Sequence, residues 1–213
     1  MAEPVSRPVR ADARRNYDRL LEVAVHAFAT DGAYVALERI ARTAGVGIGT
    51  LYRHFPTREA LVEAVYRHEL SDLCDAVPGL LESLPPDEAT RAWMDQFIDY
   101  LTAKHYMAEA LRAVIASGGN PYAESRRRLI AAATTLLDAG ATAGTLRADV
   151  DPNDVLVAIN GVSLAAGGLT QRGQAGRLLD LLLEGLRPHV TALAGLPQQT
   201  SGPIDRSGGT SVS

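Results

Sequence analysis

A short segment of this 213-residue chain carries side chains that suit contact with a nucleic-acid duplex. Tyr52, Arg53 and His54 stand in succession and supply a ring, a guanidinium and an imidazole, groups that bind phosphates or the edges of bases. Gly47 and Gly49 come just before them, and their lack of a side chain lets the backbone approach a partner closely. The chain has no nucleophile-elbow motif, phosphate-binding loop or Cys–His arrangement, so we expect no catalytic residue and no enzyme.

Two short helices are expected to position these groups. The first spans about residues 36–44 and is broken by Gly45, and the second spans about residues 48–54. The apolar positions expected to face inward are Leu37, Ile40, Ala41, Leu51 and Phe55. Residues 36–55 therefore predict a helix-turn-helix, whose second helix fits a major groove roughly 12 Å wide. The alternative is a helical hairpin that binds no DNA, since such hairpins are common in all-α proteins.

Longer helical patterns flank this motif on both sides. Before it, apolar residues recur at the helical period from Asp12, the expected N-cap, and this helix ends at Gly32. After it, Thr57 is the expected N-cap of a helix that stops at Pro78. The sequence thus predicts two helices that frame the helix-turn-helix.

Three arginines near these helix starts suit phosphate groups. Arg58 combines its charge with the dipole of the helix that begins there. Arg14 and Arg15 oppose the dipole of the first helix, which favours a phosphate partner. A helix start that is merely solvated by these two side chains is the alternative.

The second half of the chain predicts more helices and no strand. Helical patterns cover about residues 87–104, 106–116, 121–139, 151–167 and 174–189, with Gly- or Pro-rich breaks between most of them. The expected fold class is all-α, with about nine helices: an N-terminal three-helix helix-turn-helix domain plus a C-terminal helical bundle. The expected divisions are a flexible arm over 1–11, the helix-turn-helix domain over 12–70, the bundle over 71–190 and a disordered tail over 191–213.

Composition and charge exclude several classes of protein. Apolar residues make up 46% and charged residues 22% of the chain, ordinary values for a soluble globular protein. The net charge is −4, but residues 1–70 hold ten Arg against nine acidic side chains, whereas the rest is acidic. The single cysteine, Cys74, allows neither an intramolecular disulfide nor a Cys-based zinc site, and we expect a small core residue, with a redox sensor as the alternative. With no signal peptide, transmembrane stretch or metal-ligand spacing, we expect a cytoplasmic protein without metal, cofactor or membrane contact.

Residues 13–70 resemble the DNA-binding domain of TetR-family transcriptional regulators. The segments that carry the resemblance are ARRNYDRLLEVAVHAFATDGA and LERIARTAGVGIGTLYRHFPTREALVEAV. The resemblance implies a double-stranded DNA operator as partner, faced by Val46, Gly47, Ile48, Gly49, Tyr52, Arg53 and His54. It also implies a phosphate contact for Arg58. Leu37 departs from the pattern, because many relatives have a phosphate-binding hydroxyl there. Arg7 and Arg10 of the arm are expected to help read the operator.

Large side chains concentrate in two of the later helices of this aromatic-poor chain. They are Trp93, Phe97, Tyr100, Tyr106 and Met107. At helical spacing such residues more often form core than pocket, although bundle interiors are common ligand sites. The TetR resemblance implies a cavity for a small-molecule effector there, and the segment AWMDQFIDYLTAKHYMAEALRAVIASGG is similar to SbtR-like regulators.

The last two predicted helices differ in composition from the rest. Small residues are frequent over 153–168 and leucine is dense over 177–186. A buried core helix explains such a pattern. The resemblance instead implies a homodimer through these two helices, which would hold two reading helices ~34–36 Å apart on a palindromic operator. Residues 71–190 would then be an effector-binding and dimerisation domain.

The function implied is a ligand-responsive homodimeric repressor that a small-molecule effector releases from its operator. One alternative is a helical small-molecule-binding module or enzyme with a vestigial helix-turn-helix. Another is an activator or architectural DNA-binding protein without an effector. The sequence specifies neither the effector, the operator nor the regulated genes, and the choice of repressor over activator rests on the family alone.

Overall fold

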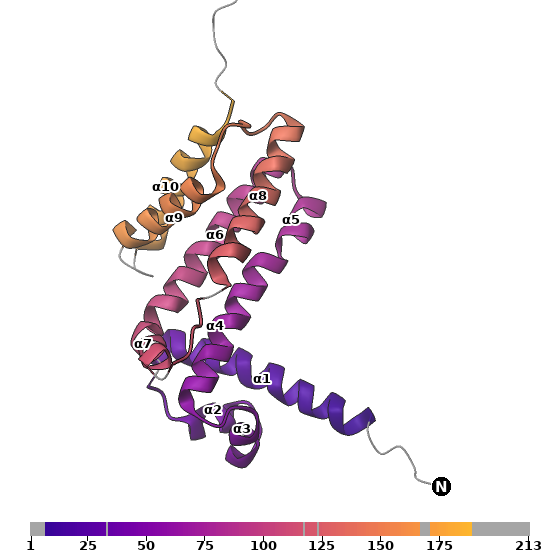
Figure 1. Cartoon of the computed structure of the whole chain (residues 1–213), viewed down its shortest axis with the longest axis vertical. Helices are drawn as coiled ribbons and strands as arrows, with labels where there is room; N and C mark the ends of the chain where they lie inside the picture. The colour runs from indigo at the N-terminus through magenta and orange to yellow at the C-terminus, as the bar shows by residue number, and fades with distance from the viewer. Residues whose placement is uncertain (1–6, 33, 117, 123, 167–170, 189–213) are drawn as a thin grey trace, which may run out of the picture.

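The computed structural model describes residues 7–32, 34–116, 118–122, 124–166 and 171–188. These residues form helices and no strand, which confirms the expected all-α class. The helices are α1 (Arg7–Asp31), α2 (Leu37–Thr43), α3 (Ile48–His54), α4 (Arg58–Asp75), α5 (Val77–Ser83), α6 (Pro86–Tyr106), α7 (Ala108–Ala116), α8 (Ser125–Ala143), α9 (Pro152–Ala166) and α10 (Arg172–Leu186). Figure 1 shows α1, α2 and α3 at one end of a longer bundle that holds the remaining helices.

The head, formed by α1, α2 and α3, closes around a small apolar core. Phe28, Ile40 and Leu51 contribute one side chain from each helix, and each is at most 1% exposed. The turn between α2 and α3 requires Gly45, because its φ of +68° lies in the left-handed region. The amide of Gly32 donates to the Phe28 carbonyl, which confirms the predicted end of the first helix.

The first helix begins at Arg7 and not at Asp12, so the predicted start was wrong. Pro8 stands in the first turn, where its missing N–H would have no partner in any case. Asp12 lies inside the helix and pairs with Arg15, one turn further on. The C-terminal part of the predicted arm is therefore helical, and residues 1–6 lie outside the described residues.

The helix α4 leads from the head into the bundle (Figure 1). The Thr57 hydroxyl accepts a hydrogen bond from the Ala60 amide at 3.1 Å, which confirms the predicted N-cap. The helix ends at Asp75 and α5 follows, whereas the sequence predicted one helix as far as Pro78. Proline cannot continue a helix but fits the first turn of a new one, so the break falls just before it.

One predicted helix break in the bundle was wrong for a packing reason. Gly140 lies inside α8, and a Cβ atom there would come within 2.4 Å of the Leu146 Cδ1 atom. The glycine therefore serves a close approach of the following segment, and the helix ends at Gly144, whose φ is +71°. The other long helices of the bundle begin and end within a few residues of the predicted bounds. The predicted tail over 191–213 lies outside the described residues.

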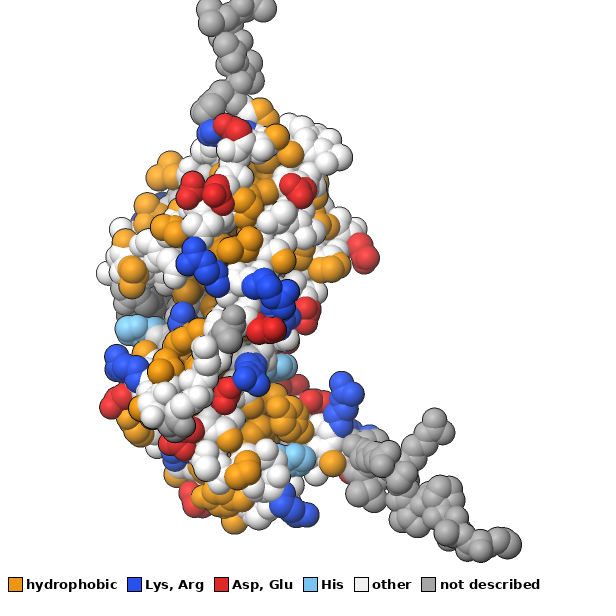
Figure 2. All heavy atoms as spheres, viewed as in Figure 1, with side chains coloured by type: hydrophobic (Ala, Val, Ile, Leu, Met, Phe, Trp, Pro, Cys, Tyr) orange, Lys and Arg blue, Asp and Glu red, His pale blue; other side chains and the backbone are white. Residues whose placement is uncertain are grey.

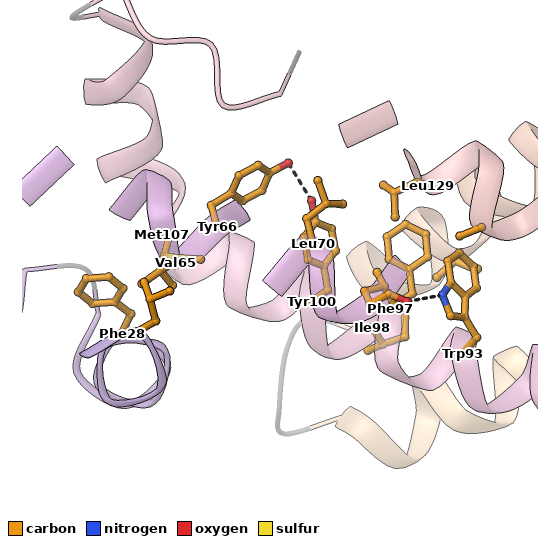
Figure 3. Packing of buried hydrophobic residues seen from close by; sticks show 14 of the residues in the cluster. Phe28, Val65, Tyr66, Leu70, Trp93, Phe97, Ile98, Tyr100, Met107 and Leu129 are labelled. Atoms are coloured by element: carbon orange, nitrogen blue, oxygen red, sulfur yellow. Dashed lines mark hydrogen bonds between the residues drawn. The ribbon is translucent and has the colours of Figure 1, made fainter. Parts of the chain in front are cut away.

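The helix α6 forms the centre of the bundle and contacts α4, α5, α8, α9 and α10. Figure 3 shows the large side chains that gather along it. The Trp93 ring is 1% exposed, and its indole N–H donates to the Leu73 carbonyl at 2.9 Å. Its ring centroid lies 5.3 Å from that of Phe97. The helices α9 and α10 pack against each other on one flank of the bundle (Figure 1).

Candidate nucleic-acid interface and ligand cavity

The helix α3 is fixed to the head by one face and exposes the other. Leu51 is fully buried and Phe55, directly after the helix, is 2% exposed. On the opposite face Ile48 and Tyr52 are 36% and 45% exposed, although both side chains are large and apolar. Such exposure has no stabilising role in the head itself. It leaves an amphipathic surface that can meet a base edge or a thymine methyl group.

The backbone at the start of α3 is unobstructed. A Cβ atom built at Gly47 or Gly49 would meet nothing within 4 Å. These glycines are therefore not required by packing within the head. Their absent side chains leave the amino end of α3 open to solvent.

The Arg53 guanidinium is held along the outer face of α3. Its Nε–H donates to the Gly49 carbonyl at 3.2 Å, and Nη2 donates to the Thr50 hydroxyl at 3.0 Å. Both contacts are exposed, so the group remains available to an outside acceptor. Thr50 was not among the predicted site residues, although its place three residues before Arg53 on one helix was the available signal of this contact.

The remaining predicted residues of the head occupy different environments. His54 is half-buried, and its ring centroid lies 5.8 Å from that of Tyr17 on α1. Val46 is also half-buried and packs against the core. Arg14 and Arg15 are exposed on α1. The side chains of residues 7–11, which include the two arginines expected to help readout, lie outside the described residues.

Arg58 joins the start of α4 to the helix-turn-helix. Its Nη1 donates to the Val35 carbonyl at 2.8 Å, across the chain segment that leads into α2. The predicted phosphate-binding side chain thus also has an architectural role. Tyr34, beside Val35, is 65% exposed and was missed by the sequence analysis. The position of this tyrosine in the connection between two helices was the available signal of an exposed aromatic side chain.

The bundle contains two adjoining hollows. The first, called the inner cavity because it reaches the buried Tyr66 and Tyr100, is a hollow of about 270 Å³ that is open to solvent, and it is lined from four helices by residues that include Tyr66, Phe97, Tyr100, Ser125, Leu129 and Leu156. The outer pocket, of about 620 Å³, adds residues that include Thr102, His105, Tyr106, Ala108, Ser163 and Leu164. Leu101, Lys104, Tyr122 and Asn160 line both. The four shared residues make the two spaces neighbours.

The predicted pocket residues divide between cavity and core. Phe97 and Tyr100 line the inner cavity, and Tyr106 lines the outer pocket. Trp93 and Met107 are each 1% exposed and line neither hollow. Figure 3 shows Met107 on the side of Val65 and Trp93 at the far end of the cluster.

The polar lining of the cavity was not predicted from the sequence. Tyr66, Lys104, Tyr122 and Asn160 come from three helices and one loop, so no local spacing links them. The concentration of tyrosine in the chain was the available signal, since seven of its eleven aromatic side chains are Tyr.

A chain of hydroxyl groups crosses the inner cavity wall. The Tyr100 hydroxyl donates to the Tyr66 hydroxyl at 2.8 Å, and the Tyr66 and Ser125 hydroxyls lie 2.8 Å apart. Figure 3 shows the two tyrosines pointing toward one another from α4 and α6. Burial raises the pKa of Tyr100 far above its ordinary value. The Tyr100 hydroxyl therefore acts as a neutral hydrogen-bond donor.

The helices α9 and α10 carry an apolar face that no described element covers. Val157, Leu164 and Leu181 are 61%, 82% and 69% exposed. Figure 2 shows hydrophobic side chains at the surface along this edge of the molecule. The predicted alternative of a wholly buried helix pair is therefore wrong, because each helix buries one side and exposes the other.

Comparisons with known proteins agree with both halves of this architecture. Residues 20–65 match the family described as bacterial regulatory proteins, tetR family, and residues 85–188 match the SbtR-like transcriptional regulator C-terminal domain. The chain is 57% identical to the TetR transcriptional regulator SCO0520 from Streptomyces coelicolor, with a TM-score of 0.78 over 81% of this chain and 99% of that one. The chain belongs to the TetR family of transcriptional regulators.

Other TetR relatives extend the comparison. The TetR transcription regulatory protein from Mycobacterium vanbaalenii is 34% identical, with a TM-score of 0.70 over 85% of this chain and all of that one. A curated HTH-type transcriptional regulator of Staphylococcus aureus (strain USA300) is 38% identical over 63 residues, which are 29% of this chain. The match spans only 34% of that relative's length.

The TetR assignment bears on the exposed face of α3. This chain is a DNA-binding transcriptional regulator, and the tetR match includes both helices of the helix-turn-helix. Its relatives are described as transcriptional regulators. Across the described residues, no helix is long and apolar enough to span a membrane. The same residues contain no group of three or more His, Cys, Asp or Glu placed to hold a metal ion.

Proposed function

We propose that this regulator is a homodimeric repressor that binds a palindromic operator through α3 and leaves it when a small molecule fills the inner cavity. The observation that carries the proposal is the course of α4. Tyr66 on this helix lines the inner cavity, and Arg58 at its start donates to the Val35 carbonyl in the head. The two residues are eight positions apart, or about 12 Å along a helix. A displacement of α4 by a ligand would therefore move the head directly.

The proposed DNA contacts follow from exposure. Ile48, Tyr52 and Arg53 would face bases, with Gly47 and Gly49 admitting the backbone. The residues proposed to contact phosphates or complete the surface are Arg14, Arg15, Val46, His54 and Arg58. This division assigns specificity to α3 and positioning to the charged groups around it.

The proposed dimer uses the uncovered face of α9 and α10. Val157 and Leu164 lie two helical turns apart on α9, where Val157 also lines the inner cavity and Leu164 the outer pocket, and Leu181 lies on the neighbouring helix. Exposed leucines grouped in this way favour burial against a second copy of the same face. A two-fold axis there would present both α3 helices to one side of a duplex, about one helical turn apart.

Operator binding tests the proposal with the DNA that flanks the protein's own gene. In a gel shift, Arg53→Ala should weaken binding about tenfold or more, because an arginine contact with a base is worth ~1–3 kcal/mol. Arg127→Ala is the matched control, since this arginine is exposed on α8 in the bundle. Equal affinity for the wild type and Arg53→Ala would contradict the placement of α3 in the groove.

A further inference from the structure

Lys104 is the only lysine of the chain and lines both hollows of the bundle. It lies in the last turn of α6 and is half-buried. Its Nζ atom lies 4.8 Å from the centroid of the Tyr122 ring. The ring stabilises the ammonium group from one side, which leaves donor directions free toward the cavity.

None of the ion pairs among the described residues involves Lys104. The arginines that cross between helices behave differently: Arg91, Arg172 and Arg128 each pair with an aspartate. No Asp or Glu is among the described residues that line either hollow. The second cation of the inner cavity, Arg126, donates to the Asn153 side chain at 2.9 Å.

Partial burial of an unpaired ammonium group disfavours its charged form. Desolvation lowers the pKa of Lys104, with no counter-charge to restore it. A structural lysine at this place would gain stability from a carboxylate, yet the chain provides none there. An ammonium group without a counter-charge inside a cavity is the arrangement expected of a ligand-binding group.

The surrounding helix ends add to the positive potential. Ser125 and Arg126 lie in the first turn of α8, and Asn153 lies in the first turn of α9. Helix amino ends carry partial positive charge. The carboxyl end of α6 carries partial negative charge, which the Lys104 ammonium group offsets.

Apolar side chains line another part of the inner cavity. Phe97, Leu129, Leu156 and Val157 line it, and the linked Tyr66 and Tyr100 hydroxyls already bond to each other. These apolar side chains can contact a hydrocarbon or aromatic body, while the polar part of the lining lies beside them.

We infer that the effector is an organic anion with an apolar body, whose acid group binds Lys104 and whose body lies in the inner cavity. The inference rests on the proposed function, because it names the class of ligand for that cavity. It specifies a carboxylate, sulfonate or similar group on a hydrocarbon or aromatic frame. Neutral compounds of the same shape should bind more weakly.

Two fluorescent probes separate charge from shape. The sulfonate 8-anilinonaphthalene-1-sulfonate and the uncharged N-phenyl-1-naphthylamine share one ring system, and both brighten in apolar cavities. Titration into the full-length protein should give tighter binding of the sulfonate. Lys104→Met should weaken binding of the sulfonate about tenfold or more and change that of the neutral probe less than about twofold. Lys104→Arg should retain binding of the sulfonate.

Arg127→Met is the matched control, because this exposed arginine pairs with Glu124 outside both hollows. Circular dichroism establishes that each variant keeps its helices, and Lys104→Gln replaces Lys104→Met if that variant does not fold. Unchanged binding of the sulfonate in the folded Lys104 variant would overturn the inference. A folded Lys104 variant that loses binding of both probes equally would also overturn the inference. Lys104 would then act through the shape of the cavity and not through its charge.

The operator gel shift keeps this inference separate from the proposed function. If the neutral probe binds as tightly as the sulfonate, the anion preference fails and the ligand-responsive repressor stands. If neither probe binds the wild type, the inference fails together with the ligand-release part of the proposed function. Operator binding by α3 is measured independently in either case.

Discussion

The hydroxyl of Tyr100 on α6 donates to the hydroxyl of Tyr66 on α4, at a distance of 2.8 Å, where α4 passes the inner cavity. Tyr66 is fully buried and Tyr100 is 3% exposed, so neither hydroxyl has bulk water as an alternative partner. The Ser125 hydroxyl, at the start of α8, lies 2.8 Å from that of Tyr66. Tyr66 thus links the helix that enters the head to both long helices behind it.

Tyr66→Phe should destabilise the protein more than Tyr100→Phe does. Tyr66 stands in the middle of the hydroxyl chain, and its loss leaves both Tyr100 and Ser125 without this partner. We expect a loss of ~1–3 kcal/mol in the free energy of unfolding for Tyr66→Phe and ~0.5–1.5 kcal/mol for Tyr100→Phe. Urea denaturation followed by circular dichroism measures both. A larger loss for Tyr100→Phe than for Tyr66→Phe would show that the Tyr100 and Ser125 hydroxyls do not depend on Tyr66.

Leu164→Glu should convert the proposed dimer to monomers. Leu164 is 82% exposed on α9, so a charge there does not disturb the core of one protomer, but it would be buried in the proposed interface. Ile115→Glu on α7 is the matched control, because Ile115 is also an exposed apolar side chain, at 45%. Light scattering after size-exclusion chromatography gives the mass. A dimer that survives Leu164→Glu would remove α9 from the interface.

Gly140→Ala should destabilise the protein, although alanine normally favours a helix over glycine. The added Cβ would lie 2.4 Å from the Leu146 Cδ1 atom and 2.8 Å from its Cβ atom, so the segment after α8 must move. We expect a loss of ~1–3 kcal/mol. Gly79→Ala on α5 meets nothing within 4 Å and should gain ~0.5–1 kcal/mol. Thermal unfolding of the two variants distinguishes the effect of packing from that of helix propensity.

Glu69→Gln should raise the melting temperature at pH 7 and lose this advantage in acid. Burial raises the pKa of Glu69 and the charge of Asp72 raises it further, so the folded state holds the proton more tightly than the unfolded chain does. The contribution of Glu69 to stability is therefore full below the pKa of the unfolded chain, about 4.3. It falls as the pH rises through the pKa of the folded state. Glutamine does not titrate. Melting curves from pH 4 to pH 7 test whether the melting temperatures of the wild type and Glu69→Gln become equal in acid. The exposed Glu82→Gln is the control.

Local signals predicted the head well. Thr57 before a helical run and Gly32 after one are caps that act through their own backbone, and the structure has both in those roles. Gly45 marked the turn for the same reason, because only glycine adopts its positive φ without strain. The exposed face of α3 followed from the spacing of Leu51 and Phe55, which bury the opposite side.

Tertiary contacts decided what the sequence could not show. In the sequence, Gly140 resembles a helix break. In the structure it lies inside α8, and Leu146 packs where its side chain would be. Trp93 and Tyr100 share one helix and one aromatic character, yet Trp93 bonds to a backbone carbonyl in the core and Tyr100 lines a cavity. Lys104 is visible in the sequence as the only lysine, but its significance depends on the absence of acidic side chains from the lining of the two hollows, which only the fold shows.

The single lysine also has a practical consequence. Amine-acylating reagents have Lys104 as their one side-chain target in this chain, with the terminal amino group as the other amine. The lowered pKa of Lys104 increases the fraction of free amine at neutral pH and thereby its nucleophilicity. Protection of this one position from acylation would report occupancy of the cavity without any engineered label, in mass spectra of the unmodified regulator.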